Sequence, residues 1–207
     1  MRSQYINELE AVRQNLIAMG ETTILLLDEA LKAIADPNPG PSARASELES
    51  QTDNQHRLIH DQCLDLITLQ QPVAGDARLL TGILDAIVDL ELIGDYAYEI
   101  VTLAAPLGRR IPSPVTTQIA EIGGKVRDTL AAAIASWRLG DRDQALSARP
   151  REAPIRAECD ALYPKLAQLV VSPGAGTSYV DLMLVCKHLQ RTLRHSVCIA
   201  DQAAEAA

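Results

Sequence analysis

Apolar side chains recur along this chain in alternating steps of three and four residues, which is the spacing of one face of an α-helix. Stretches rich in proline and glycine separate the apolar segments, and no two-residue alternation is long enough for a sheet. The pattern therefore predicts an all-α protein. Six helical segments show it: Leu9–Ala33, Leu48–Leu66, Leu80–Val101, Ile119–Trp137, Ile155–Leu169 and Val180–Val197.

The six helices fall into two groups of three on either side of Gly108–Pro114. Short connections between long helices favour antiparallel neighbours. We therefore expect two tandem three-helix bundles, residues 1–107 and 108–207, that repeat after about one hundred residues. Pro150 and Pro154 fall in the first turns of the fifth helix, and because interior prolines break or kink helices, we expect an interruption around Ser147–Ala153.

Composition supports the helical prediction and excludes some functions. Of the 207 residues, 47% are hydrophobic but only 3% are aromatic, and phenylalanine is absent. Aliphatic cores suit packing between helices better than β-sandwiches. Single-stranded nucleic acid is bound on aromatic stacking platforms, so the scarcity of aromatic residues argues against nucleic-acid partners.

The two predicted repeats differ in charge, although the whole chain carries −8. Residues 1–107 contain 6 Lys and Arg against 17 Asp and Glu, a net −11, whereas residues 108–207 contain 13 against 10, a net +3. An acidic half attracts cations, and a basic half attracts anions or acidic partners.

Cysteine spacing and hydropathy predict an intracellular protein. Cys63, Cys159, Cys186 and Cys198 match no zinc or disulfide framework, so we expect small buried thiols in a reduced, cytoplasmic chain. The amino terminus carries charges where a signal peptide would be apolar. The longest apolar run, Leu130–Trp137, is too short to span a bilayer.

Two carboxylates fall on the apolar side of the third helix. At 100° per residue, Glu91 and Asp95 lie within about 20° of Leu84, whereas Asp89 and Glu99 lie toward solvent. Carboxylates that face a core need a compensating partner. A bound hard cation is one such partner, and arginine partners or a wet groove are the alternatives.

The second helix adds two further candidate ligands. Glu49 and His56 are seven residues apart and lie on one edge of that helix. Placed opposite Glu91 and Asp95, they would complete a metal site; alone, His56 is equally typical of a surface position. The predicted metal ligands are therefore Glu49, His56, Glu91 and Asp95.

The sixth helix carries cations instead. Lys187, Arg191 and Arg194 follow one another at helical spacing, with His188 and His195 beside them. This stripe predicts a site for a partner or an anion, and a solvated helix face is the alternative. The sequence shows no nucleophile elbow, phosphate loop, dinucleotide fingerprint or zinc-protease motif, so we expect no enzyme and no catalytic residues.

Two motifs resemble the PhoU family of phosphate-uptake regulators. Gln70–Arg78 reads QQPVAGDAR, close to the family's QQPxAxDLR, and Glu91–Ile100 reads ELIGDYAYEI, close to E-R-I-G-D-x-A-x-N-I. Tyr5–Leu9 and Met19-Gly20 are similar in character. The resemblance extends over the whole chain in length and helix order, and it is specific up to about residue 105.

The resemblance implies a fold and a function. Family members have two tandem three-helix bundles, each with an acidic metal-binding motif on its third helix, and they are cytoplasmic, often dimeric and not enzymes. They repress the phosphate-starvation response by coupling a phosphate ABC transporter to a sensor histidine kinase. Glu91 and Asp95 match the first motif, and Glu49 and His56 fall near further acidic positions.

The second motif departs from the family pattern. Gln190 replaces the Glu, Arg194 replaces the Asp and Leu193 replaces the Gly. A guanidinium cannot ligate a metal. We therefore expect a divalent cation, iron or zinc at the first repeat only, with Arg194 serving as a built-in cation that pairs with Glu158 or Asp160.

Three functions follow from these observations. The leading hypothesis is a cytoplasmic adaptor that negatively regulates phosphate uptake, forms a homodimer, and meets the membrane only through the transporter and the kinase. The alternative is a helical accessory or chaperone-like protein tethered to another anion transporter, which the altered second motif would allow. A metal-dependent hydrolase that uses Glu91 and Asp95 is the third, and it lacks a converging base or nucleophile.

Overall fold

The computed structural model describes residues 2–35, 42–70, 72–107, 113–171 and 177–207. Every regular element in these ranges is helical, which confirms the all-α prediction. None of the described helices is both long and apolar enough to cross a membrane. The proline- and glycine-rich stretches at 36–41 and 172–176, and most of the boundary at 108–114, lie outside the described residues. The helices are α1 (Arg2–Ala35), α2 (Ala43–Gln70), α3 (Ala74–Ala104), α4 (Ser113–Leu139), α5 (Arg142–Leu146), α6 (Arg149–Val170) and α7 (Ser178–Ala206).

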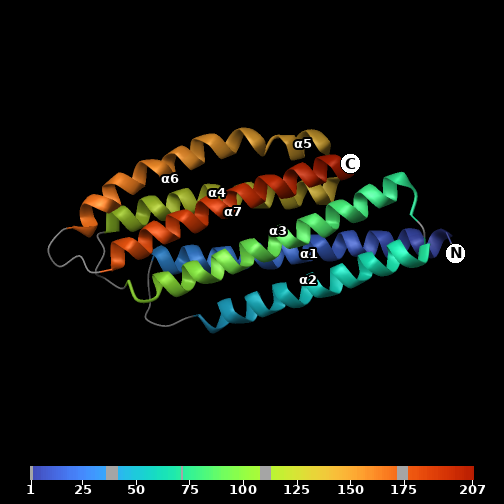
Figure 1. Ribbon diagram of the computed structural model, residues 1–207, viewed down its shortest axis with the longest axis horizontal. Coiled ribbons are helices and arrows are strands. Elements are labelled where there is room, and N and C mark those ends of the chain that lie inside the picture. The colour runs from blue at the N-terminus through green and yellow to red at the C-terminus, as the bar shows by residue number, and fades with distance from the viewer. Residues whose placement is uncertain (1, 36–41, 71, 108–112, 172–176) are drawn as a thin grey trace.

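The long helices form an elongated bundle (Figure 1). Helices α1, α2 and α3 contact one another on one side, while α4, α6 and α7 do so on the other. Contacts of α1 with α4 and of α3 with α7 join the two sides, and the α3–α7 contact is the most extensive between any two of the described helices. Successive long helices run in opposite directions, as the short connections predict (Figure 1).

The expected interruption of the fifth helix is present. Gly140 ends α4 with a left-handed φ of 62°, the usual role of a glycine just past a helix. The Asp141 side chain then caps the short α5 by accepting hydrogen bonds from two backbone amides. α5 ends at Leu146 and α6 begins at Arg149. Pro154 is accommodated inside α6, so the break lies at the start of the predicted window.

The core is aliphatic, as the composition predicts. Leu, Ile, Val and Ala residues from all the helices form one buried cluster. Trp137 is buried within it, and its indole N–H donates to the Ile199 carbonyl at 3.0 Å, which links α4 to α7. Cys63, Cys159 and Cys186 are buried as expected, whereas Cys198 is only half-buried. Burial raises the pKa of the Cys63 thiol to about 12, so it packs as a neutral apolar group.

Reciprocal glycine contacts join α1 to α4. Gly20 lies against the Ile134 side chain, and Gly123 lies against the Leu31 side chain, so closely that a methyl group at either glycine would overlap its neighbour. The two glycines are 103 positions apart, and so are Leu31 and Ile134. Each helix thus presents a glycine to a branched side chain of the other, as expected of two related halves in an antiparallel pair.

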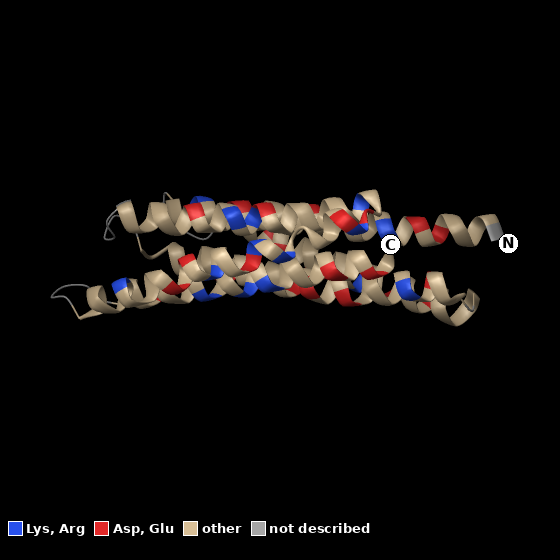
Figure 2. Ribbon diagram, turned by 90° about the horizontal axis from the view of Figure 1, so that it is seen from above, with Lys and Arg blue, Asp and Glu red and all other residues tan. Residues whose placement is uncertain are grey.

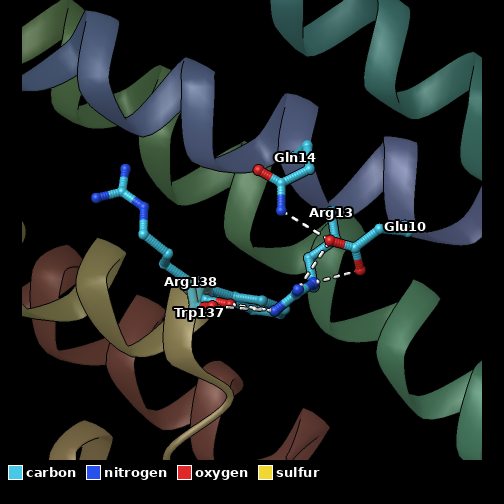
Figure 3. A network of polar contacts seen from close by, with 5 residues as sticks. All are labelled: Glu10, Arg13, Gln14, Trp137 and Arg138. Atoms are coloured by element: carbon cyan, nitrogen blue, oxygen red, sulfur yellow. Dashed lines mark hydrogen bonds and ion pairs between the residues drawn. The ribbon is translucent and has the colours of Figure 1, made fainter.

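Arginine 13 of α1 binds the end of α4 (Figure 3). Its guanidinium donates to the Trp137 carbonyl at 2.9 Å and to the Arg138 carbonyl at 3.4 Å, while Glu10 pairs with it at 2.8 Å. The last four carbonyls of a helix have no partner within the helix, and a cation there also interacts favourably with the helix dipole. Arg13 therefore fixes where α1 crosses α4.

Candidate functional site

An acidic cluster lies where α2 passes α3. Glu49, Asp53 and Asp95 each bring one carboxylate oxygen to within 4.8 Å of the other two. Glu49 and Asp53 are half-buried and Asp95 is exposed. Glu49 and Asp53 are one helical turn apart, and this i, i+4 spacing presents both on the same side of α2.

The packing of α2 on α3 brings the cluster together. The hydroxyl of the buried Thr52 donates a hydrogen bond to the Leu48 carbonyl, 3.0 Å away, and its methyl group faces α3. There it meets Gly94, where a Cβ would stand 3.4 Å from that methyl carbon. Asp53 and Asp95 each follow directly after these contact residues, so the close approach of the two backbones sets the distance between their carboxylates.

The electrostatics of the cluster favour a bound cation. The pKa of the Asp95 carboxyl is raised above its usual value, first by loss of water around it and then by the negative charges of Glu91, Asp53, Glu49 and Glu99. Like charges in one site disfavour the ionised form, and a cation relieves that repulsion. Carboxylate oxygens are the ligands that hard divalent cations prefer. The donor set therefore fits a metal.

The predicted ligands divide into two groups. Glu49 and Asp95 join the cluster, whereas Glu91 pairs with His56, whose Nδ1 lies 3.5 Å from Glu91 Oε1. Asp53 was missed by sequence reasoning, although its position four residues after Glu49 repeats the spacing of Glu91 and Asp95. The metal-binding role of the four predicted residues remains a prediction, and Asp53 is a further candidate ligand.

The helical-wheel placement of the third-helix acids is wrong. Asp95 is exposed and Glu91 is half-buried, and Leu84, the assumed centre of the apolar stripe, is itself half-buried. α3 packs against α1, α2 and α7, so its buried face is broad and centred near Ile87 and Leu90, which are fully buried. The two acids therefore lie at its edge, facing α2, rather than in the core.

The cationic residues of the last helix lie on its outer face. Lys187, Arg191 and Arg194 are all exposed, and Arg191 lies over the ring of Tyr96 of α3, with its Cζ 5.5 Å from the ring centroid. Across the molecule, Lys and Arg are interspersed with Asp and Glu along the bundle (Figure 2). Binding of a partner or an anion at the three cations stays a prediction.

The expected pairing of Arg194 is wrong. Lys125 of α4 forms an ion pair with Glu158 at 2.6 Å, and Gln190 donates a hydrogen bond to Asp160 at 2.7 Å. Arg194 is exposed and pairs with neither acid. In the altered second motif, Gln190 rather than Arg194 therefore contacts an acid of α6.

A polar network that sequence reasoning missed lies between α3 and α7. His195 Nδ1 lies 2.7 Å from Asp89 Oδ1, and Gln202 donates to the other Asp89 oxygen at 2.9 Å. His188 Nε2 lies 3.0 Å from Glu99 Oε2. Asp89, which the wheel placed toward solvent, is half-buried, because α7 covers that side of α3. The only signal in the sequence was the presence of His188 and His195 beside the cations.

Both histidine rings of the last helix pack against one tyrosine. The Tyr96 ring centroid lies 5.5 Å from that of His188 and 5.8 Å from that of His195. The pKa of His188 is lowered, mainly because the imidazole is buried and also because Arg191 is near, while Glu99 opposes the shift. This network ties the two halves together next to both candidate sites.

Comparison with known proteins confirms the family resemblance. Residues 16–104 match the PhoU domain. A "Phosphate-specific transport system accessory protein PhoU homolog" of Pseudomonas aeruginosa is 28% identical over 200 residues, which covers 96% of this chain and 83% of the relative. A homolog of the same name from Synechocystis is 28% identical over 201 residues, covering 97% and 90%. The crystal structure of PhoU from Pseudomonas aeruginosa superposes with a TM-score of 0.91 at 26% identity, covering 98% of each chain.

Proposed function

We propose that this PhoU-family chain is an accessory regulator of phosphate transport that acts by contact and not by catalysis. The observation that carries the proposal is the likeness to PhoU over nearly the whole chain, in sequence at 28% identity and in structure at a TM-score of 0.91. The relatives are named as accessory proteins of the phosphate-specific transport system. The described residues offer exposed charged helix faces suited to such contacts.

In this proposal the chain represses phosphate uptake and the phosphate-starvation response when phosphate is plentiful. It works in the cytoplasm as a homodimer, and it contacts a phosphate ABC transporter and a sensor histidine kinase. It reaches the membrane only through these partners. The family resemblance supports each of these partners.

A metal supports the fold of the first repeat in this proposal. Glu49, Asp53 and Asp95 would hold a divalent cation, iron or zinc, with Glu91 and His56 beside them. The cation would neutralise the crowded carboxylates and hold α2 against α3. The second repeat, with Gln190 bound to Asp160, needs no metal there.

Deletion of the gene in its host tests the proposal. In phosphate-rich medium, loss of the protein should raise phosphate uptake and switch on a phosphate-starvation reporter, and a plasmid copy should restore both. Unchanged uptake and reporter activity would refute the proposed function. A change confined to the transport of a different anion would establish the alternative, an accessory protein tethered to another transporter.

A further inference from the structure

The outward face of α7 carries five side chains in one line, here called the α7 stripe: Val180, Leu184, Lys187, Arg191 and Arg194. Val180 and Leu184 are 43% and 45% exposed, and the three cations that follow them are exposed too. The steps of four, three, four and three residues keep all five on one side of the helix. At 1.5 Å per residue the line is about 21 Å long.

The acids on either side of the α7 stripe are engaged elsewhere. On the α3 side, Glu99 contacts His188 at 3.0 Å. On the α6 side, Asp160 accepts a hydrogen bond from Gln190 at 2.7 Å. Within the described part of the chain, Lys187, Arg191 and Arg194 are exposed and form no ion pair, and Arg191 contacts the ring of Tyr96.

We propose that the α7 stripe docks an acidic amphipathic helix of a protein partner. The inference rests on the proposed function, since a regulator that acts by contact needs such a surface, and it names the chemistry of the partner. Two exposed apolar residues followed by three unpaired cations match a helix that presents two apolar residues and then acids along one face. Charge complementarity of this kind sets the partner's register and raises its association rate.

The surroundings of the α7 stripe favour a helix over a membrane surface. The cations form a line one helix wide, bordered by Glu99 of α3, which contacts His188, and by Asp160 of α6, which contacts Gln190. A flat anionic bilayer would bring its phosphates against these acids as well as against the cations. A single helix, about 10 Å across, can contact the line while leaving the bordering acids in water.

A designed peptide provides the direct test. The probe is a 15-residue helical peptide with two leucines and three glutamates spaced to face the α7 stripe, and its control is a scrambled peptide of the same composition. Fluorescence anisotropy with the full-length protein should show binding of the patterned peptide and much weaker binding of the scrambled one. Lys187→Glu/Arg194→Glu should lower the affinity about tenfold or more, since exposed ion pairs each contribute up to about fivefold and reversal adds repulsion.

A matched variant controls for net charge. Arg142→Glu/Arg151→Glu makes the same change at exposed positions on α5 and α6, and it should leave the affinity within about twofold. Circular dichroism confirms that both variants fold. Equal losses in the two variants, or equal binding of the two peptides, would overturn the inference. The inference would also be overturned if vesicles of phosphatidylcholine and phosphatidylserine bound the protein through Lys187 and Arg194 and the patterned peptide did not bind.

A cell-based measurement separates this inference from the proposed function. If deletion of the gene derepresses the phosphate-starvation reporter and the Lys187→Glu/Arg194→Glu protein still restores repression, the proposed function stands and the α7 stripe is not the docking surface. If deletion leaves the reporter unchanged, the proposed function is the one that fails. Failure of the double variant, with repression restored by Arg142→Glu/Arg151→Glu, supports both.

Discussion

His195 of α7 and Asp89 of α3 lie 2.7 Å apart across the junction between the two halves of the bundle. The opposite side of that junction, between α1 and α4, is held by arginines: Arg127 pairs with Asp28 at 3.1 Å, and Arg13 binds the end of α4. Guanidinium groups stay charged at all physiological pH values, whereas on the α3–α7 side burial lowers the pKa of His188. The two sides of the junction therefore respond differently to acid.

Acidification should weaken the junction through His188. Its pKa is lowered in the folded state, mainly by burial, so below about pH 6.5 the unfolded chain takes up a proton that the folded protein resists. The stability present above pH 6.5 is thus lost as the pH falls through the folded pKa. Urea unfolding should show a steeper loss of stability between about pH 7 and 5.5 for the wild type than for His188→Gln.

The exposed His60 on α2 supplies the control for that experiment. It belongs to α2 and not to the α3–α7 junction, and it lies beside Asp61, so His60→Gln should leave the effect of His188 in place. A His188→Gln protein that loses stability with acid as steeply as the wild type would show that other groups dominate.

Removing one charge from the acidic cluster should stabilise the metal-free protein. The pKa of Asp95 is raised, so the folded state holds its proton more readily, and the ionised group opposes folding at neutral pH. Asp95→Asn should raise the free energy of unfolding at pH 7 by no more than about 1 kcal/mol, because Asp95 is exposed and water screens the repulsion. The gain should shrink as the pH falls through the raised pKa. A loss of stability in chelator-treated protein would instead mean that Asp95 makes specific stabilising pairs.

Metal binding should depend on Asp53 as much as on Asp95. Isothermal titration of chelator-treated protein with Mn²⁺ should show at most one site per chain, located at the first repeat. Asp53→Asn should weaken it by at least about tenfold, since it removes one of three clustered carboxylates. Glu158→Gln is the matched control in the second repeat, where Lys125 already neutralises the carboxylate. Binding that survives Asp53→Asn and disappears with Glu158→Gln would move the site to the other half.

The helices could be predicted from the sequence because their apolar spacing is local information. The break before α6 was predictable for the same reason, since proline acts on its own helix. Asp53 was missed because only the contact of Thr52 with Gly94 brings it opposite Asp95. The burial of Asp89 was not predicted because the helix that covers it, α7, lies more than one hundred residues later in the sequence. A wheel for a single helix assumes one buried face, and α3 has three helical neighbours.

The glycines of α1 and α4 should respond in opposite ways to alanine. Alanine is the better helix former by up to about 1 kcal/mol, so Gly124→Ala, where the new methyl group meets nothing within 4 Å, should stabilise by about 0.5–1 kcal/mol. Gly20→Ala should destabilise by about 1–3 kcal/mol, because its methyl group overlaps the branched Ile134 side chain. The change in stability for Gly123→Ala should lie between these two values, because the new methyl group meets mainly the end of the Leu31 side chain, which can change rotamer.

Chemical denaturation of the three glycine variants measures these differences, and a double variant identifies their cause. If the overlap with Ile134 is responsible, Gly20→Ala should cost less in an Ile134→Ala background than in the wild type, because the truncated side chain leaves room for the methyl group. The coupling between the two positions should then be at least about 0.5 kcal/mol. Additive effects would show that Gly20 is needed for some other reason than its contact across the α1–α4 junction.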